Sequence, residues 1–350
     1  MEYPKLLTGV AYHGNRILRH VDDDMRDIVN HNMNLVVHMF SHNDWDRHKG
    51  VMPDIIKISE SYGLEVWVDN WGIGGPPGDK SHFLQYHPEA HQIYADGTPD
   101  PVSSCYNSEA FVQFTKDWLD VVRASGGKRI FWDEPRFKSK KLADGSKISS
   151  CHCESCKKLF RERYGKEMPS IDTPELQEFR AWTLTNYFDR VTTYSASLGM
   201  QNYAGIMLHT LDVAAGIAQL PHLDNFGTDP YWFPRKKPDE AIGGTDPYDF
   251  VYTNTRYTIE QAEKYGKGHH IWIQGYDIPA GREDDIILAT DAAYDAGART
   301  IIDWSFRGGE SNSYRSDDCE RCWQVMGEAM ARIRSRHFDA IRAERQKKFQ

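Results

Sequence analysis

The sequence predicts a (β/α)8 barrel that forms a single catalytic domain over residues 1–350, with long βα loops after the third and fourth strands. Three observations indicate this fold: apolar runs of strand length recur along the chain, segments with helical periodicity separate them, and glycines follow the helices. Strands that alternate with helices need crossover connections and therefore run parallel. Eight such units are sufficient to close a barrel.

The eight predicted strands are apolar runs that end in polar or aromatic residues. They cover residues 7–13, 35–40, 64–69, 129–134, 203–209, 223–231, 270–274 and 300–304. The predicted helices cover residues 22–30, 52–62, 110–124, 174–198, 249–265, 283–296 and 320–342. Glycine marks the ends of five of them, where a left-handed residue is readily accommodated: Gly63, Gly126, Gly199, Gly266 and Gly297.

Composition and charge narrow the class of ligand. The chain has ten Trp and eighteen Tyr, which suits a site for amphipathic ligands such as sugars. Its formal net charge of -9, without a basic stripe, argues against a nucleic-acid partner. No apolar run approaches the roughly 18 residues of a membrane span, and the first residues do not form a signal sequence, so we expect a soluble cytoplasmic protein. The sequence carries no signal of oligomeric state.

The predicted strand ends carry the side chains expected of a carbohydrate site. Aromatic rings contact the apolar faces of pyranose rings, and acids, amides and imidazoles bind hydroxyl groups. A single strand-end Asp often only caps the following helix, but this density favours a sugar site. The candidates are His13, His38, Asp69, Trp71, Asp133, Glu134, His209, Asp229, Tyr231, Trp232, Gln274, Asp277, Asp303, Trp304 and Arg307.

Two adjacent acids end the fourth predicted strand, in the stretch "RIFWDEPRF". Glycoside hydrolysis normally uses two carboxyl groups, one of which protonates the leaving oxygen. An apolar wall and the neighbouring charge of Asp133 favour a protonated Glu134, which predicts Glu134 as the general acid. Because strand residues alternate between faces, only one of the two acids is expected to face the lumen.

The same stretch resembles a known signature. "WDEP" is similar to the Asn-Glu-Pro motif of the large retaining clan of TIM-barrel glycoside hydrolases, which implies that Glu134 is the general acid/base and that Asp133 stands where the Asn would be. "IWIQGYDIP" resembles the segment that carries the nucleophile in that clan, but Gln274 and Gly275 occupy the positions of its Thr and Glu. The second carboxyl group must therefore come from elsewhere.

Four residues are candidates for this second carboxyl group. "NFGTDPYW" ends the sixth predicted strand, and the clan of α-galactosidases and α-glucosidases places its nucleophile on strand 4 and its acid on strand 6. This resemblance favours Asp229, with Asp277 and Asp303 as alternatives beside Asp133 itself.

A cysteine array follows the fourth strand. "CHCESCKKLFRERYG" contains Cys151, Cys153 and Cys156 in C-x-C-x2-C spacing, with Cys105 upstream. It resembles the array of family 42 β-galactosidases, which implies a structural zinc held by these four thiolates. Three unrelated thiols or a disulfide are the alternatives. Cys319 and Cys322 are open to three interpretations: ordinary helix residues, a second metal site, or a replacement for Cys105.

Two other functions remain open at this level. A metal-dependent sugar isomerase or lyase would use His13, His38, Asp69 and His209 as its metal ligands. A sugar-binding pseudoenzyme would explain why the seventh strand lacks the expected Glu.

Overall fold

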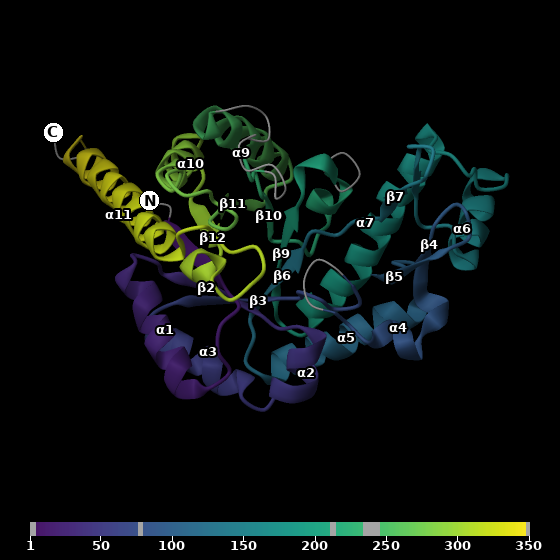
Figure 1. The fold of residues 1–350 in the computed structure, drawn as a ribbon, viewed down its shortest axis with the longest axis horizontal. Helices are drawn as coiled ribbons and strands as arrows, with labels where there is room; N and C mark the ends of the chain where they lie inside the picture. Colours follow the sequence, from purple (N-terminus) through teal and green to yellow (C-terminus); the bar gives the residue numbers. More distant parts are fainter. Residues whose placement is uncertain (1–4, 76–79, 211–214, 234–245, 348–350) are drawn as a thin grey trace. The chain divides into compact units, whose positions relative to one another are not determined.

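The computed structural model describes residues 5–75, 80–210, 215–233 and 246–347 (Figure 1). Eight parallel strands form a closed barrel in the order β1-β12-β11-β10-β9-β6-β3-β2. These strands are β1 (Leu7–Tyr12), β2 (Leu35–Met39), β3 (Glu65–Asp69), β6 (Arg129–Asp133), β9 (Gln201–Ile206), β10 (Asn225–Thr228), β11 (Gly268–Gln274) and β12 (Thr300–Trp304). The predicted (β/α)8 barrel is confirmed.

Helices connect the barrel strands, and seven of them correspond to the predicted segments. They are α1 (Leu18–Asn30), α3 (Met52–Ser61), α5 (Glu109–Ala124), α7 (Pro174–Ser197), α9 (Pro247–Lys264), α10 (Asp285–Asp295) and α11 (Cys319–Lys347). The five glycines predicted to end helices all have positive φ, from 67° at Gly266 to 111° at Gly297.

The chain divides into two compact units. The first contains residues 1–39, 51–67 and 225–350, and the second contains residues 40–50 and 68–224. In the first unit, β12 pairs with β1 and β11, so that Asp303 lies beside Val10 and Ile273. In the second unit, β6 pairs with β9 from Arg129 and Gln201 to Asp133 and Gly205.

The second unit also contains short elements that periodicity did not predict. They are α2 (His42–His48), α4 (Phe83–Tyr86), η1 (Pro88–Ala90), the hairpin of β4 (His91–Ile93) and β5 (Pro99–Ser104), the hairpin of β7 (Ser139–Lys141) and β8 (Lys147–Ser149), and α6 (Glu154–Tyr164). The turn η2 (Leu208–Thr210) follows β9, and η3 (Ala215–Gln219) precedes β10. In the first unit, η4 (Phe306–Gly309) follows β12.

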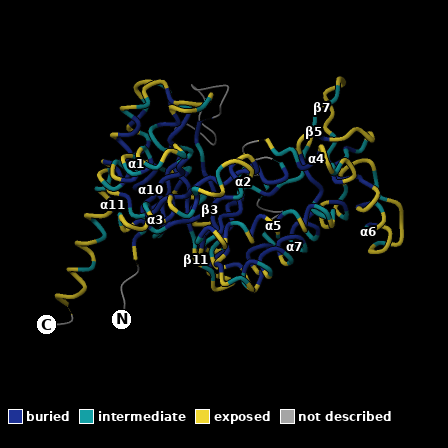
Figure 2. Tube along the Cα trace, turned by 90° about the horizontal axis from the view of Figure 1, so that it is seen from below, coloured by how far each residue is buried: buried dark blue, intermediate teal, exposed yellow. Residues whose placement is uncertain are grey.

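The buried residues lie on the strands and on the inner faces of the helices. Figure 2 shows the strands and the inner faces of the helices as buried, and the second half of α11 as largely exposed. In α11 the last buried residue is Ile333. None of the helices in the described ranges combines the length and hydropathy that a membrane span requires.

Candidate functional site

Three carboxyl groups gather at the ends of two strands in the second unit. β3 ends at Asp69, and β6 ends at Asp133, which Glu134 follows. Asp69 is fully buried, and neither of its carboxylate oxygens makes a hydrogen bond of normal geometry to a described residue. Burial, reinforced by the charge of Asp133, raises the pKa of Asp69 well above its usual range. Burial and the charge of Glu134 likewise raise the pKa of Asp133. Both aspartates therefore favour the protonated form.

Glu134 differs from its two neighbours in backbone and in charge. Its φ of 34° lies in the left-handed region, which costs a non-glycine residue roughly 1–2 kcal/mol, and such strain is common at functional sites. The extended backbone thus ends at Asp133, and the strand alternation that we expected for Asp133 and Glu134 does not extend to Glu134. The Oε2 atom of Glu134 accepts a hydrogen bond from Nη1 of Arg136 at 2.5 Å, in an ion pair whose side chains are 17% and 20% exposed. Glu134 thus has a direct cationic partner, which Asp69 lacks among its hydrogen bonds.

A tyrosine hydroxyl fixes the backbone of Arg136. The hydroxyl of Tyr106 accepts a hydrogen bond from the N–H of Arg136 at 3.0 Å and donates one to its carbonyl oxygen at 3.3 Å. The amide of Gln92 also donates to this carbonyl, at 3.5 Å. Burial raises the pKa of Tyr106 to about 12, so the hydroxyl remains a donor at neutral pH. On the other side, the side chain of Asn70 accepts the N–H of Asp133 at 3.0 Å.

A small cavity adjoins this group. Its volume is about 30 Å³, and its lining includes Asn70, Gln92, Tyr106, Asp133 and Arg136. A cavity of this size has room for one or two water molecules. A cavity of this volume is too small for a sugar ring.

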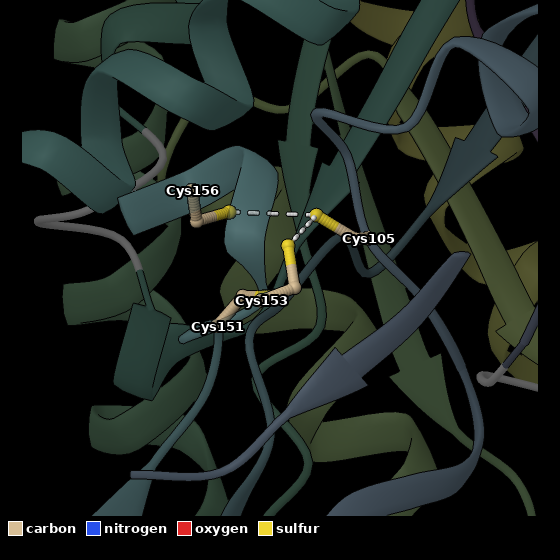
Figure 3. A group of neighbouring side chains, drawn as sticks. All are labelled: Cys105, Cys151, Cys153 and Cys156. Atoms are coloured by element: carbon tan, nitrogen blue, oxygen red, sulfur yellow. Dashed lines mark hydrogen bonds between the residues drawn. The ribbon is translucent and has the colours of Figure 1, made fainter. Parts of the chain in front are cut away.

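Four buried cysteines of the second unit form a cluster (Figure 3). Cys105 follows β5, Cys151 and Cys153 precede α6, and Cys156 lies in its first turn. The Sγ atom of Cys105 lies 3.5 Å from that of Cys153 and 3.5 Å from that of Cys156, and all four sulfurs lie within 4.8 Å of one another. Sulfurs around a tetrahedral zinc at about 2.3 Å are about 3.8 Å apart. All four cysteines are free, which excludes the disulfide alternative.

The surroundings of the cluster also suit a metal ion. Asn107 donates hydrogen bonds from its backbone to the sulfur of Cys105 at 3.4 Å and from its side chain to that of Cys156 at 3.3 Å. Hydrogen bonds among the thiols lower the pKa of Cys153, with Cys105 the first cause, and raise the pKa of Cys105, with Cys151 the first cause. Phe160 and Phe179 pack around the cluster and keep it apolar. The cluster therefore has the donor set, spacing and enclosure of a closed tetrahedral site.

Cys319 and Cys322 belong to the first unit, at the start of α11, whereas the four-thiol cluster belongs to the second. The thiol of Cys319 donates to the carbonyl oxygens of Ser316 at 3.3 Å and Gly308 at 3.7 Å. Because Cys105 itself completes the four-thiol cluster, the interpretation of Cys319 and Cys322 as its replacement is wrong. Within the described ranges neither belongs to a possible metal cluster.

The other predicted acids belong to the first unit. Asp229 directly follows β10 and is buried. Asp303 lies within β12, and neither oxygen of its fully buried carboxyl group has a hydrogen-bond partner among the described residues. Burial raises the pKa of Asp303 well above its usual range. Asp277 has a positive φ of 56°, and its N–H donates to the carbonyl of Tyr314 at 2.9 Å.

Several residues expected to bind substrate have structural contacts. The amide of Gln274 accepts the N–H of Phe233 at 2.9 Å and donates to the carbonyls of Phe233 and Tyr276, both at 3.2 Å. Arg307 forms ion pairs with Asp27 at 3.3 Å and with Glu320 at 2.7 Å. These side chains brace the first unit.

The predicted aromatic platforms differ in burial. Trp232 is fully buried, which places it in the core. Trp71, Tyr231 and Trp304 are each partly exposed. Tyr231 packs edge-on against Tyr276 at 5.3 Å between ring centroids, and Trp304 contacts His13 at 4.7 Å. These three rings retain the exposed surface that a sugar platform needs.

The ligands of the isomerase alternative do not form a metal cluster within the described residues. His38 is fully buried, and its Nε2 atom lies 2.8 Å from the hydroxyl of Ser59 in α3. Burial lowers the pKa of His38 to about 3, which keeps it neutral. His209 lies in η2, and its side chain is outside the described part of the structure.

Sequence reasoning missed two groups of residues. Arg136 was not among the predicted site residues, but it is paired with Glu134, and the hydroxyl of Tyr106 binds its backbone. The second group consists of His42, Asp46 and His82, whose side chains lie close together. The i,i+4 spacing of His42 and Asp46 in α2 was a readable signal for this group.

Comparison with known proteins shows which solved structures share this fold. No family model and no curated protein matches the chain. Among solved structures, it is similar to the catalytic domain of β-amylase from Paenibacillus polymyxa, with a TM-score of 0.67 and 10% identity over 94% of this chain and 100% of that chain. It is also similar to the endo-β-1,4-mannanase from Thermotoga petrophila, with a TM-score of 0.57 and 10% identity over 95% of this chain and 77% of that chain. A third similar structure is the PgaB (BpsB) glycoside hydrolase domain from Bordetella bronchiseptica, with a TM-score of 0.59 and 11% identity over 92% of this chain and 99% of that chain. The chain thus shares the fold of several glycoside hydrolases.

Proposed function

We propose that this protein is a glycoside hydrolase in which Glu134 is the general acid/base. The observation that supports it most is the group of three interacting carboxyls at the ends of β3 and β6, where Asp69 and Asp133 favour the protonated form and Arg136 pairs with Glu134. The carboxyl ends of barrel strands are where the catalytic residues of this fold lie. The likeness in fold to named glycoside hydrolases adds support.

The electrostatics of the group bear on the role of each acid. Glycoside hydrolysis requires one group that gives a proton and one that carries negative charge, and environments that separate their pKa values assign these roles. The ion pair with Arg136 suits Glu134 as the base half of an acid/base cycle, and protonation during turnover requires that this pair weakens. Asp133 has the raised pKa of a donor, but it lines a cavity with a volume of only about 30 Å³. We therefore assign the acid/base role to Glu134 and a supporting role to Asp133.

Asp229 is the proposed second catalytic carboxyl group. It follows β10 directly, as the strand-6 acid of the similar clan does, and the partly exposed ring of Tyr231 lies two residues further on. Asp303 is the less suitable alternative because it is fully buried within its strand. Asp277 remains the other alternative.

The test is a screen of nitrophenyl glycosides, with product stereochemistry followed by NMR, on the wild type and on Glu134→Gln. The amide retains the shape of the side chain and loses the proton, so we expect turnover to fall roughly 10²–10⁴-fold while sugar binding persists. Glu154→Gln is the matched control, because Glu154 is 85% exposed on α6. Asp229→Asn is expected to be similarly inactive.

Three outcomes separate this proposal from the alternatives. Near-normal turnover by Glu134→Gln would remove Glu134 from the mechanism, and loss of turnover in Asp133→Asn alone would transfer the role to Asp133. Sugar binding without hydrolysis of any glycoside would favour the pseudoenzyme. Activity that a chelator abolishes while the fold persists would favour the metal-dependent isomerase or lyase.

We also propose that Cys105, Cys151, Cys153 and Cys156 hold one structural zinc. Four thiolates complete a tetrahedral shell and leave no position for water, so such a site stabilises the fold and does not take part in catalysis. The family 42 resemblance of the array and its free, buried thiols support this assignment. Cys105 precedes Tyr106, whose hydroxyl holds Arg136, so the metal would brace the segment that carries Glu134.

A further inference from the structure

A second cluster of possible metal ligands lies in the loops of the second unit that follow β2 and β3. His42 and Asp46 lie one turn apart on α2, and His82 immediately precedes α4. The Nε2 atom of His82 lies 3.1 Å from Oδ2 of Asp46, and Nε2 of His42 lies 3.9 Å from Oδ1 of Asp46. All three residues offer a ligand atom within 4.8 Å of the others.

The distances between these ligand atoms are close to those between ligand atoms that share one metal ion. Zinc binds imidazole nitrogen and carboxylate oxygen at about 2.0–2.2 Å, so ligand atoms in a tetrahedral shell are about 3.3 Å apart. The pair of His82 with Oδ2 of Asp46 is already at 3.1 Å, and the pair of His42 with Oδ1 needs to close by about 0.6 Å from 3.9 Å. Asp46 and His82 are partly exposed, so their side chains can make this adjustment.

The surroundings of His42 hold its ring in one place. Its Nδ1 atom lies 2.9 Å from the hydroxyl of Ser81, its ring stacks on that of His82 at 3.8 Å, and Phe114 contacts its edge at 4.8 Å. When Ser81 accepts the hydrogen bond from Nδ1, the lone pair of His42 is on Nε2, the atom nearest Asp46. A partner on the second ring nitrogen is typical of metal-binding histidines.

We propose that His42, Asp46 and His82 bind a divalent transition-metal ion, with Zn²⁺ as the natural occupant. Imidazole and carboxylate ligands suit zinc and the other late first-row ions, and the order of affinity among these favours copper, nickel and zinc over manganese. The site would join α2 to the residues before α4. Three protein ligands leave a position for water or a small ligand, in contrast to the closed four-thiol cluster.

The experiment must separate this site from the thiolate cluster. Protein whose metal content has been brought to one zinc per chain is titrated with Co²⁺, and binding is followed by calorimetry and visible absorption. We expect one further equivalent of metal, without the intense thiolate-to-cobalt absorption that a cysteine site would give. Hydrogen exchange should slow at residues 80–86 when this metal binds, because the ion links them to α2.

Variants identify the ligands. His82→Ala and Asp46→Asn remove a ligand each and should weaken binding by more than the roughly 10–100-fold that loss of an outer partner causes. Ser81→Ala removes an outer partner and should weaken metal binding by roughly 10–100-fold. His48→Ala changes a histidine at the end of the same helix and should leave the metal affinity unchanged. No further equivalent, or equal affinity in all four variants, would overturn the proposal. Circular dichroism of each metal-free variant checks that it is folded.

Discussion

Tyr106→Phe tests whether the hydroxyl of Tyr106 positions the segment that carries Glu134. The substitution keeps the ring and removes the two hydrogen bonds to the backbone of Arg136, at 3.0 and 3.3 Å. The carbonyl of Arg136 keeps a long contact of 3.5 Å with Gln92, but its N–H loses the partner that Tyr106 supplied. Position 136 is then freer to move, and with it the guanidinium that pairs with Glu134.

The expected loss of stability follows from these contacts. A hydrogen bond contributes about 0.5–1.5 kcal/mol net, and a buried donor left without a partner costs about 1–3 kcal/mol. The lost bond to the carbonyl and the orphaned N–H together predict a loss of about 1.5–4.5 kcal/mol in the free energy of unfolding. A misplacement of about 1 Å at a catalytic group lowers turnover up to about 10²-fold, so we expect kcat to fall roughly 10–100-fold with KM little changed.

The assay pairs urea denaturation with steady-state kinetics on the glycoside found in the screen. Tyr194→Phe is the matched control, because its hydroxyl donates one exposed hydrogen bond to Asp120 at 2.8 Å and its loss should cost less than about 1 kcal/mol. If Tyr106→Phe unfolds at the same urea concentration as Tyr194→Phe and keeps its kcat, the hydroxyl does not position Arg136 and the reasoning fails.

Two further predictions concern the metal and the buried acids. Cys105→Ser should lower the zinc content from about one per chain and lower Tm, as should a chelator, because bound metal stabilises only the folded state. The control Cys319→Ser should change neither the zinc content nor Tm. Equal zinc content in both variants would contradict the four-thiol site. Asp69 has a raised pKa in the folded state, so from its unfolded value of about 3.9 up to that raised pKa, stability should fall with rising pH by up to about 1.4 kcal/mol per pH unit. Asp69→Asn should flatten this dependence in urea denaturation between pH 5 and 8, and an unchanged slope would show that Asp69 does not retain its proton.

The barrel was predictable because its signals are local. Each strand is an apolar run, and each long helix shows a periodic pattern closed by a glycine with positive φ, so the strand and helix limits differ from the predicted ones by only a few residues. The largest helix differences are at the end of α11, which reaches Lys347 and not residue 342, and at the start of α1, which begins at Leu18 and not at residue 22. Short elements such as α2 and the β7–β8 hairpin were missed because three to seven residues are too few to show a period.

The candidate site was predictable only where its residues are close in sequence. The C-x-C-x2-C spacing identified three of the four clustered thiols, and Cys105 was the one remaining upstream cysteine. The pairing of Tyr106 with Arg136 joins residues 30 positions apart, and no sequence pattern encodes such a contact. His82 was missed for the same reason, because it lies far along the chain from His42.

The four-thiol cluster is linked to the segment that carries Glu134 through the peptide bond from Cys105 to Tyr106 and the hydrogen bonds between Tyr106 and Arg136, and a double-mutant cycle can test this link. Cys105 holds the position of Tyr106, and the effect of Cys105 on Glu134 must pass through the hydroxyl of Tyr106 if that hydroxyl is what binds Arg136. Cys105→Ser should then lower kcat in the wild type but lower it little further in Tyr106→Phe, because the link is already broken. Its effect on Tm should persist in both backgrounds, because the proposed zinc would also stabilise the loop before α6. If the effects on kcat multiply as those of independent sites do, the cluster acts on Glu134 by another route, and the structural coupling proposed for Tyr106 is wrong.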